Sequence, residues 1–285
     1  MSTPGLPVME AATEAQVPLV PLRLASFARS PRLRHGITGR SPGLWRDGDI
    51  SYATGGDPAR VLANRHAWAA QIGVDATRIV AVRQVHGNVV DCVNAAARGR
   101  GAFSLTAEDV PAADALITIA LDTPLLLSFA DCTPLLFYDP VRGTVGLAHA
   151  GWRGTVTDIA GATVAAMFSQ FGSLPGDIIA GIGPAIGRCC YVVDEPVTSA
   201  WLTLGVADPL VLEEIAPDNG RRQWRFDLAR ANRLLLQRAG VPVEQIEDAA
   251  ICTACNVATF PSHRAQQGQA GRFAAIISLA TDEAA

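Results

Sequence analysis

Residues 115–150 read ALITIALDTPLLLSFADCTPLLFYDPVRGTVGLAHA, and this stretch decides the fold. It contains four short apolar runs that are bounded by Asp, Pro or Gly residues. Apolar runs of this length with such boundaries are typical of buried β-strands. We therefore expect strands at 115–121, 125–129, 135–138 and 145–148.

Sequence on both sides of this stretch adds further elements. Apolar runs predict strands at 79–85, 177–182 and 273–279, and amphipathic spacing predicts helices at 58–72 and 227–239. A third helix is expected over 155–171, because Thr155 and Asp158 have the spacing of a capping box. Strands and helices that do not alternate strictly predict an α+β fold, a single domain with mixed β-sheets packed against helices.

The expected domain covers residues 23–285. Residues 1–22 are rich in Pro, Ala and Glu without periodicity, which predicts a flexible N-terminal tail. With 49% hydrophobic and 18% charged residues, the 285-residue chain can bury a sizeable core. The sequence has neither a secretory signal nor the run of about 20 apolar residues that a membrane span needs. We expect a cytoplasmic protein with no membrane partner.

The charge pattern excludes some functions. The net charge is −4, and nothing in the sequence has the basic footprint of a duplex nucleic-acid binder, so no nucleic-acid partner is expected. All 23 basic residues are Arg. A Schiff-base or P-loop lysine mechanism is therefore impossible.

Three residues of metal-ligand type lie where strands are expected to end: His86, Cys132 and His149. Two His and one Cys, with a fourth position open, form the donor set of a catalytic zinc. Without a metal, the same side chains could form a thiolate–imidazole pair in which Cys132 is the nucleophile of a hydrolase or amidase. The residues alone leave both alternatives open. Asp131, beside Cys132, could orient one of the imidazoles.

A phosphate site is predicted directly after His149. If Thr155 caps a helix, the free N–H groups of the first turn around Gly154 favour an anion. Arg153 would add a forked donor that matches phosphate oxygens. The alternative is that Arg153 forms an ordinary structural ion pair.

Four other cysteines form two short motifs, Cys189-Cys190 and Cys252-x-x-Cys255. The second motif lacks the Pro and the His-x-Glu that accompany it in zinc nucleobase deaminases. The two motifs could meet in a structural zinc site or a redox pair. Because adjacent cysteines are awkward chelators, we expect buried thiols instead.

Several motifs together resemble the laccase-domain (polyphenol oxidase type) family of purine nucleoside phosphorylases. The resemblance spans roughly residues 35–280, and its most specific element is the run His-Ala-Gly-Trp-Arg-Gly that begins at His149. The segments that carry it are 84–87, 113–116, 130–134, 149–155, 183–191, 227–232, 252–253 and 271–272.

The resemblance implies an α+β fold and one zinc held by His86, Cys132 and His149. It also implies phosphorolysis of adenosine, inosine and methylthioadenosine to the base and ribose 1-phosphate, together with adenosine deamination. The partners would then be a purine nucleoside and phosphate. In such a reaction an acidic group, Asp114 or Asp131, would help the purine to leave.

The chain departs from the family pattern in four places. Residues 40–44 stand where the family has a Gly-Gly-Val-Ser turn, and residues 259–264 stand where it has a Phe-Phe-Ser-Tyr-Arg run. Ala53 replaces an Asn of the family, and Val192 replaces a Glu. These changes leave the three metal-ligand residues intact. They bear on the loops that would contact the nucleoside, and so on substrate preference.

A copper-linked polyphenol oxidase is the function that the family's older label suggests. A type 1 copper site uses two His and one Cys. From five His in the chain, this leaves only His35, His66 and His263. Three imidazoles are too few for a trinuclear oxygen-reducing cluster, so zinc is expected rather than copper.

Overall fold

The computed structural model describes residues 19–281 except 107, 109 and 207. Residues 1–18 of the expected tail thus lie outside the described residues. Leu22, at the end of that expected tail, exchanges two backbone hydrogen bonds with Ile37, of 2.8 and 2.9 Å. Within the described chain, no helix combines the length and the apolar character needed to cross a bilayer.

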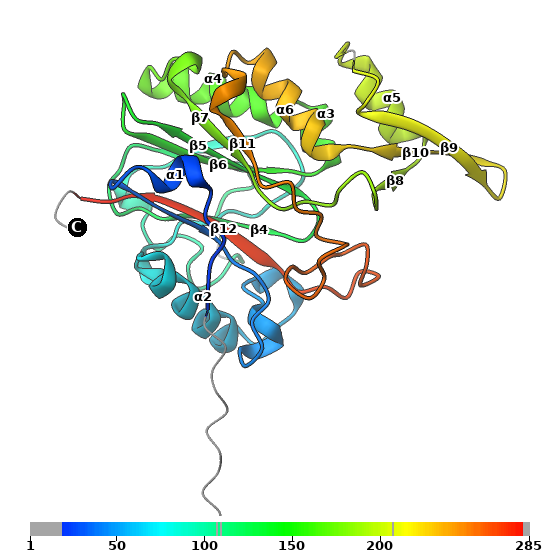
Figure 1. Ribbon diagram of the computed structural model, residues 1–285. Helices are drawn as coiled ribbons and strands as arrows, with labels where there is room; N and C mark the ends of the chain where they lie inside the picture. The colour runs from blue at the N-terminus through cyan, green and yellow to red at the C-terminus, as the bar shows by residue number, and fades with distance from the viewer. Residues whose placement is uncertain (1–18, 107, 109, 207, 282–285) are drawn as a thin grey trace, which may run out of the picture.

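Two β-sheets stacked on each other form the centre of the molecule (Figure 1). The larger sheet has six strands in the order β11 (Ile246–Asp248), β7 (Ile179–Ile182), β5 (Thr133–Asp139), β6 (Thr144–Ala150), β3 (Ala115–Thr118) and β2 (Val90–Cys92). The smaller sheet is antiparallel and contains β1 (Leu33–Ile37), β12 (Phe273–Leu279) and β4 (Leu125–Phe129). A third sheet, formed by β8 (Val192–Val193), β10 (Arg221–Phe226) and β9 (Leu212–Asp218), extends from this body.

Helices cover the outer face of each stacked sheet (Figure 1). The α-helices are α1 (Ala25–Ala28), α2 (Pro58–Ile72), α3 (Trp152–Val156), α4 (Ile159–Phe171), α5 (Glu195–Thr203) and α6 (Leu228–Arg238). Short 3₁₀ helices lie at Trp45–Gly48, Tyr52–Thr54, Ala76–Arg78, Ala95–Ala97, Pro175–Asp177 and Val243–Gln245. Helices α4 and α6 pack on the six-stranded sheet, and α2 packs on the three-stranded one. The result is a four-layered α/β/β/α domain, in which the six-stranded sheet is mixed and the three-stranded one antiparallel. The predicted α+β fold, with β-sheets packed against helices, is confirmed; the four layers were not predicted.

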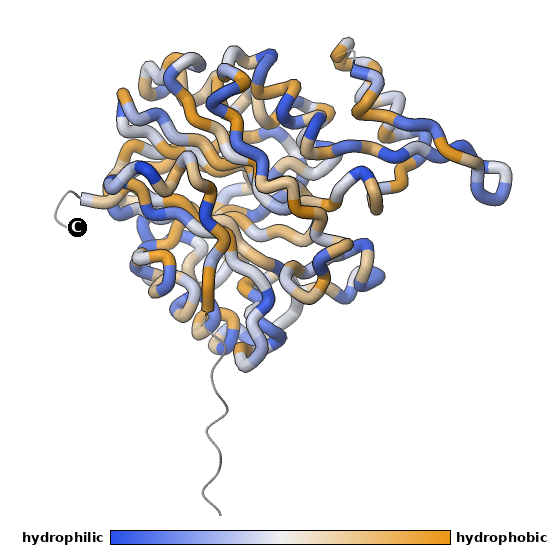
Figure 2. The backbone as a smooth tube through the Cα atoms, in the orientation of Figure 1, coloured by the Kyte–Doolittle hydropathy of each residue, from blue (hydrophilic) through white to orange (hydrophobic). Residues whose placement is uncertain are grey.

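The alternation of side chains along the strands explains the layers. In β5, Leu135 and Phe137 join the cluster beneath α4 and α6, whereas Leu136 and Tyr138 point into the space between the sheets. Successive strand residues face opposite sides, so a strand buried on both faces must be apolar throughout. Figure 2 shows this as hydrophobic colour concentrated along the central strands. The uninterrupted apolar runs of the sequence therefore reflect strands that are covered on both sides.

Most expected elements are confirmed within a few residues, including the helices at 58–72 and 227–239 and the strand at 273–279. The expected strand at 79–85 is wrong, because it makes only isolated bridges at Val80 and Arg83. Its backbone bonds in turn to Pro124, Arg100 and Pro111, so no continuous ladder forms.

The expected helix at 155–171 is also wrong in its beginning. The chain forms two helices there, and Asp158, with a φ of 59°, separates them. The Asp158 carboxylate caps α4 by accepting from the Gly161 N–H at 3.0 Å. Thr155 lies inside the short α3 and caps nothing.

Candidate metal centre

The ends of two strands and a neighbouring turn bring His86, Cys132 and His149 together. Cys132 directly precedes β5, His149 is the penultimate residue of β6, and His86 lies in a turn beside them. One ligand atom from each residue lies within 4.8 Å of the others. The two imidazole rings meet edge to face, with centroids 4.9 Å apart. The geometry thus brings together the three side chains that the sequence singled out.

Asp114 fixes the turn that carries His86. Its carboxylate accepts hydrogen bonds from the backbone N–H groups of Val85, His86 and Gly87, at 3.2, 2.9 and 2.7 Å. His86 has a φ of 61°, a left-handed conformation that a residue with a Cβ adopts only when its surroundings impose it. Three donors on one carboxylate supply that constraint.

Asp114 also orients His149. Its Oδ1 lies 3.0 Å from Nδ1 of His149, which leaves Nε2 as the ring nitrogen available to a ligand. A carboxylate behind an imidazole fixes its orientation and makes it more basic. Burial would raise the pKa of Asp114, but the hydrogen bonds from His149 and from the turn lower it. Asp114 is therefore ionised and has no proton to give to a leaving purine.

The prediction that Asp131 orients an imidazole is wrong. Its two oxygens accept from Thr253 Oγ1 at 2.6 Å and from the Arg264 N–H at 2.7 Å. Asp131 thus connects the turn before Cys132, where its own φ is 84°, to two later loops. The orienting role belongs to Asp114.

Cys132 lies between the two imidazoles and favours the thiolate. Burial raises the pKa of Cys132, but the charge of His149 and hydrogen bonds from both His86 and His149 lower it to about 6. Burial lowers the pKa of His149, but the charges and hydrogen bonds of Cys132 and Asp114 raise it to about 9. A thiolate is the form of Cys that binds metals.

The residues fit a metal ion. Two imidazoles and a thiolate are typical zinc ligands, and three protein donors leave a position for water or substrate. Gly151 keeps the space around them free, because a Cβ there would lie 2.9 Å from Sγ of Cys132 and 3.2 Å from Cδ2 of His86. The same donor set also suits copper, so it does not decide the identity of the metal.

The predicted anion site at a helix capped by Thr155 is wrong in that form. Thr155 is buried and exchanges hydrogen bonds with Asn232, and α3 has only five residues. Gly154 permits close packing, since a Cβ there would lie 3.0 Å from the carbonyl oxygen of Gly87. Arg153 is exposed, stacks 4.3 Å above the Trp152 ring, and has no ion-pair partner within the part of the chain that the structure describes. Its guanidinium therefore remains available to an anion.

Tyr191 is a site residue to which the sequence gave no role. Burial and the charge of nearby Cys132 raise the pKa of its phenol well above the usual range, whereas the charges of Arg264 and Arg153 oppose this shift. The Arg264 guanidinium lies 5.3 Å above the Tyr191 ring. A protonated phenol, with the Arg264 guanidinium over its ring, thus lies close enough to Cys132 to be influenced by its charge. In the sequence, only its position directly after Cys189-Cys190 could have singled out Tyr191.

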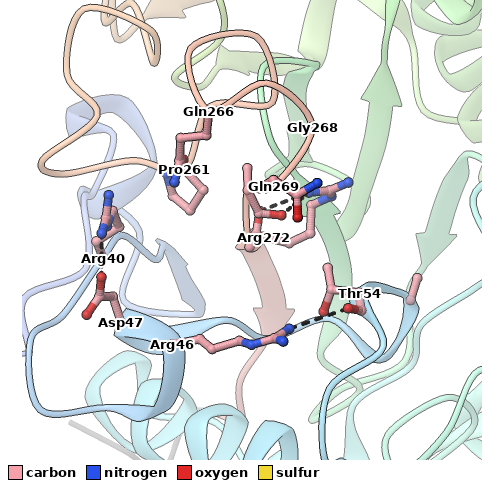
Figure 3. Close-up of a pocket in the computed structure, with 12 residues that line it drawn as sticks. Arg40, Arg46, Asp47, Thr54, Pro261, Gln266, Gly268, Gln269 and Arg272 are labelled. Carbon is pink, nitrogen blue, oxygen red and sulfur yellow. Dashed lines mark hydrogen bonds and ion pairs between the residues drawn. The ribbon is translucent and has the colours of Figure 1, made fainter.

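A separate polar cavity of about 550 Å³ is lined by residues from most of the segments that depart from the family pattern (Figure 3). Arg40, Ala53 and Pro261 belong to three of the departing segments, and all three line it. Arg46 and Arg272 add positive charge. The three proposed metal ligands do not line this cavity. The loop that forms one wall, 261–272, also supplies the Arg264 N–H to Asp131.

The remaining imidazoles do not form a second histidine cluster. In the described part of the chain, the groups able to hold a metal are this centre and a set of four cysteines. His35 is buried in β1 and accepts the Leu24 N–H, and His66 lies on α2. The trinuclear cluster of a multicopper oxidase therefore has no counterpart among these residues.

Comparison with known proteins agrees with the fold and the motifs. A family model described as multi-copper polyphenol oxidoreductase laccase matches residues 32–280. The purine nucleoside phosphorylase YlmD of Geobacillus stearothermophilus is 41% identical over 245 residues, covering 86% of this chain and 87% of that protein. A purine nucleoside phosphorylase of Deinococcus radiodurans is 34% identical over 280 residues, covering 98% and 95%.

Solved structures show the same architecture. The crystal structure of YlmD from Geobacillus stearothermophilus superposes with a TM-score of 0.84 at 36% identity, covering 93% of this chain and 100% of that one. A Bacillus licheniformis protein, YfiH, gives a TM-score of 0.80 at 35% identity, covering 87% and 92%. By sequence and by fold, the chain belongs to the multi-copper polyphenol oxidoreductase laccase family.

Proposed function

We propose that this protein is a zinc-dependent purine nucleoside phosphorylase whose centre is His86, Cys132 and His149. The observation that carries the proposal is a three-donor site with an open position. The Arg264 guanidinium stacks on Tyr191 near this site, and exposed Arg153 follows His149 by four residues. The relatives named purine nucleoside phosphorylase supply the reaction class. We infer a cytoplasmic enzyme, in line with the sequence-based expectation.

His86, Cys132 and His149 would hold the ion, and Zn²⁺ bound there supplies a Lewis acid that polarises an oxygen of the reactants. The chain's own contribution begins with Asp114. Its carboxylate keeps Nε2 of His149 facing the site and holds the His86 turn in place. Fixing these groups before substrate arrives lowers the cost of reaching the reactive geometry.

Arg153 and Arg264 are suited to phosphate, because a planar guanidinium matches two phosphate oxygens at once. Phosphate held there would attack the anomeric carbon while the bond to the purine nitrogen breaks, so that the base and ribose 1-phosphate form. Neither Asp114 nor Asp131 is free to protonate the purine, since both accept at least two hydrogen bonds within the fold. Burial raises the pKa of the Tyr191 phenol, so it keeps its proton, and we propose that it donates a hydrogen bond to the departing purine.

Inosine turnover with and without phosphate tests the proposal. Phosphate-dependent release of hypoxanthine and ribose 1-phosphate is expected, and Cys132→Ser should abolish it. Cys92→Ser, which alters an exposed thiol on β2, is the matched control. Base release at the same rate without phosphate would contradict phosphorolysis. Methylthioadenosine and adenosine extend the substrate test, and adenosine separates two outcomes, since phosphorolysis yields adenine and deamination yields inosine.

A second candidate is a metal-free cysteine hydrolase or amidase. Cys132 contacts His149, and His149 contacts Asp114. This arrangement favours the hydrolase, because it supplies a nucleophile, a base and a carboxylate that orients the base. Iodoacetamide distinguishes the two functions. A zinc enzyme should protect Cys132 from alkylation until a chelator is added, whereas a free nucleophile should react at once and lose activity.

A further inference from the structure

Four cysteines from two distant segments meet near the surface. Cys189 and Cys190 lie in the turn after β7, and Cys252 and Cys255 lie in the turn after β11. All four sulfur atoms lie within 4.8 Å of one another, and Sγ of Cys255 is 3.5 Å from that of Cys189 and 3.4 Å from that of Cys190. The expectation of buried thiols is wrong, since Cys189 and Cys255 are exposed.

The backbone around the cluster makes room for the sulfurs and directs an N–H at one of them. The Gly187 N–H donates to Sγ of Cys252 at 3.2 Å. Gly187 has no room for a side chain, because a Cβ would lie 3.0 Å from Cβ of Cys252 and 3.2 Å from Sγ of Cys189. The absence of a side chain at Gly187 therefore lets the sulfurs of the two segments approach one another.

We propose that Cys189, Cys190, Cys252 and Cys255 bind a second Zn²⁺ in a closed, structural site. Four thiolates complete the tetrahedral coordination of a structural zinc, with no position left for substrate. With Zn–S bonds of about 2.3 Å, the sulfurs of a tetrahedral site lie about 3.8 Å apart. The separations of 3.4 and 3.5 Å lie close to this value. The adjacent pair Cys189-Cys190 can contribute two ligands because both sulfurs turn toward Cys255.

This site would cross-link the loops that support the catalytic centre. Cys252 pairs with Ala185 in a β-bridge, and the Thr253 N–H donates to the Ala185 carbonyl at 3.0 Å. Thr253 then donates through Oγ1 to Asp131, the residue before Cys132. Tyr191 directly follows Cys190. The second zinc therefore holds in place the segments that carry Tyr191 and fix the Cys132 turn, without touching the reactants.

Zinc content measured on the purified full-length protein tests the proposal. We expect two zinc ions per chain in the wild type, one in Cys189→Ser/Cys190→Ser and one in His149→Ala. Cys92→Ser, which removes an exposed thiol outside the cluster, should keep two. The His149→Ala variant separates the two proposals, because its remaining zinc depends on the cysteine cluster alone.

Cobalt substitution gives a second readout that does not need the cysteine variant to fold. In His149→Ala loaded with Co²⁺, four thiolates should produce intense sulfur-to-cobalt charge-transfer bands and tetrahedral visible bands. A single zinc in the wild type that is lost in His149→Ala would overturn the proposal. A disulfide within the cluster, seen as the loss of two hydrogens in the mass of the unreduced protein, would do the same. So would alkylation of all four thiols in the folded protein as purified.

Discussion

The Asp114→Asn substitution tests how the fold prepares the metal centre. Oδ1 of Asp114 accepts from the His86 N–H and faces Nδ1 of His149, whereas Oδ2 accepts from the N–H groups of Val85 and Gly87. The amide of Asn must place an NH₂ group at one of these two positions. Whichever way it turns, two hydrogen-bond partners of the carboxylate face a donor instead of an acceptor.

The expected loss follows from those contacts. Removing the partner behind a metal-binding imidazole typically weakens metal affinity by about 10–100-fold. This corresponds to about 1.4–2.8 kcal/mol of binding free energy. Two unsatisfied groups at this part-buried turn should also lower the stability of the metal-free fold by about 1 kcal/mol or more.

Competition with a chromophoric zinc chelator measures the affinity, and urea unfolding of the apoprotein measures the stability. Asp218→Asn is the matched control, because Asp218 is exposed at the end of β9. In the same competition, the His149→Ala variant measures the zinc that is bound outside this centre. A folded Asp114→Asn protein that keeps the wild-type zinc affinity would refute the role given to this carboxylate.

Three further substitutions test the packing and the electrostatics. Gly151→Ala should weaken zinc binding about 5- to 150-fold, because overpacking costs about 1–3 kcal/mol. Gly176→Ala, in open space, should leave the chelator titration unchanged, and an unchanged titration for Gly151→Ala would refute the packing argument. Arg65→Met should lower the free energy of unfolding in urea by at least about 2 kcal/mol, because the buried guanidinium donates hydrogen bonds to three backbone carbonyls. Arg60→Met, at an exposed position of the same helix, should have little effect. Equal stabilities of the two variants would show that these buried hydrogen bonds do not stabilise the fold. Burial and the charge of Arg23 lower the pKa of His35 to about 4, so the unfolded chain, with a His pKa of about 6.5, takes up the proton first. Stability should therefore fall by about 3 kcal/mol between pH 6.5 and pH 4, and His35→Gln should remove this part of the pH dependence; an unchanged slope would show that His35 is not held neutral.

The sequence predicted the central strands and two of the three candidate metal ligands, Cys132 and His149, for one shared reason. Strands buried on both faces must be apolar throughout, and their ends are where polar side chains can reach a common space. Cys132 and His149 stood out because each interrupts an apolar run at such an end.

The roles of the two aspartates depended on strand register, which the sequence does not display. Ala115 pairs with Ala148 in the antiparallel ladder of β3 and β6, and this places Asp114 beside His149. Asp131 adjoins Cys132 in sequence, but its left-handed backbone accompanies a carboxylate bonded to Thr253 and Arg264. Proximity along the chain therefore indicated the wrong carboxylate.

The cysteine cluster and the helix boundary were missed for similar reasons. Cys189-Cys190 and the Cys252 motif meet because β7 and β11 run parallel and end together. The break before α4 depends on the positive φ of Asp158, which helix propensity does not reveal. Both features result from tertiary packing rather than from local sequence.

Anomalous diffraction at the zinc absorption edge, from crystals of the protein purified without chelator, would reveal a bound ion. We expect a peak bonded to Sγ of Cys132 at about 2.3 Å and to one ring nitrogen each of His86 and His149 at about 2.0–2.1 Å. We also expect a separate peak among the four cysteines. Strong density for the three side chains with no anomalous peak between them, in crystals soaked with Zn²⁺, would contradict the metal centre.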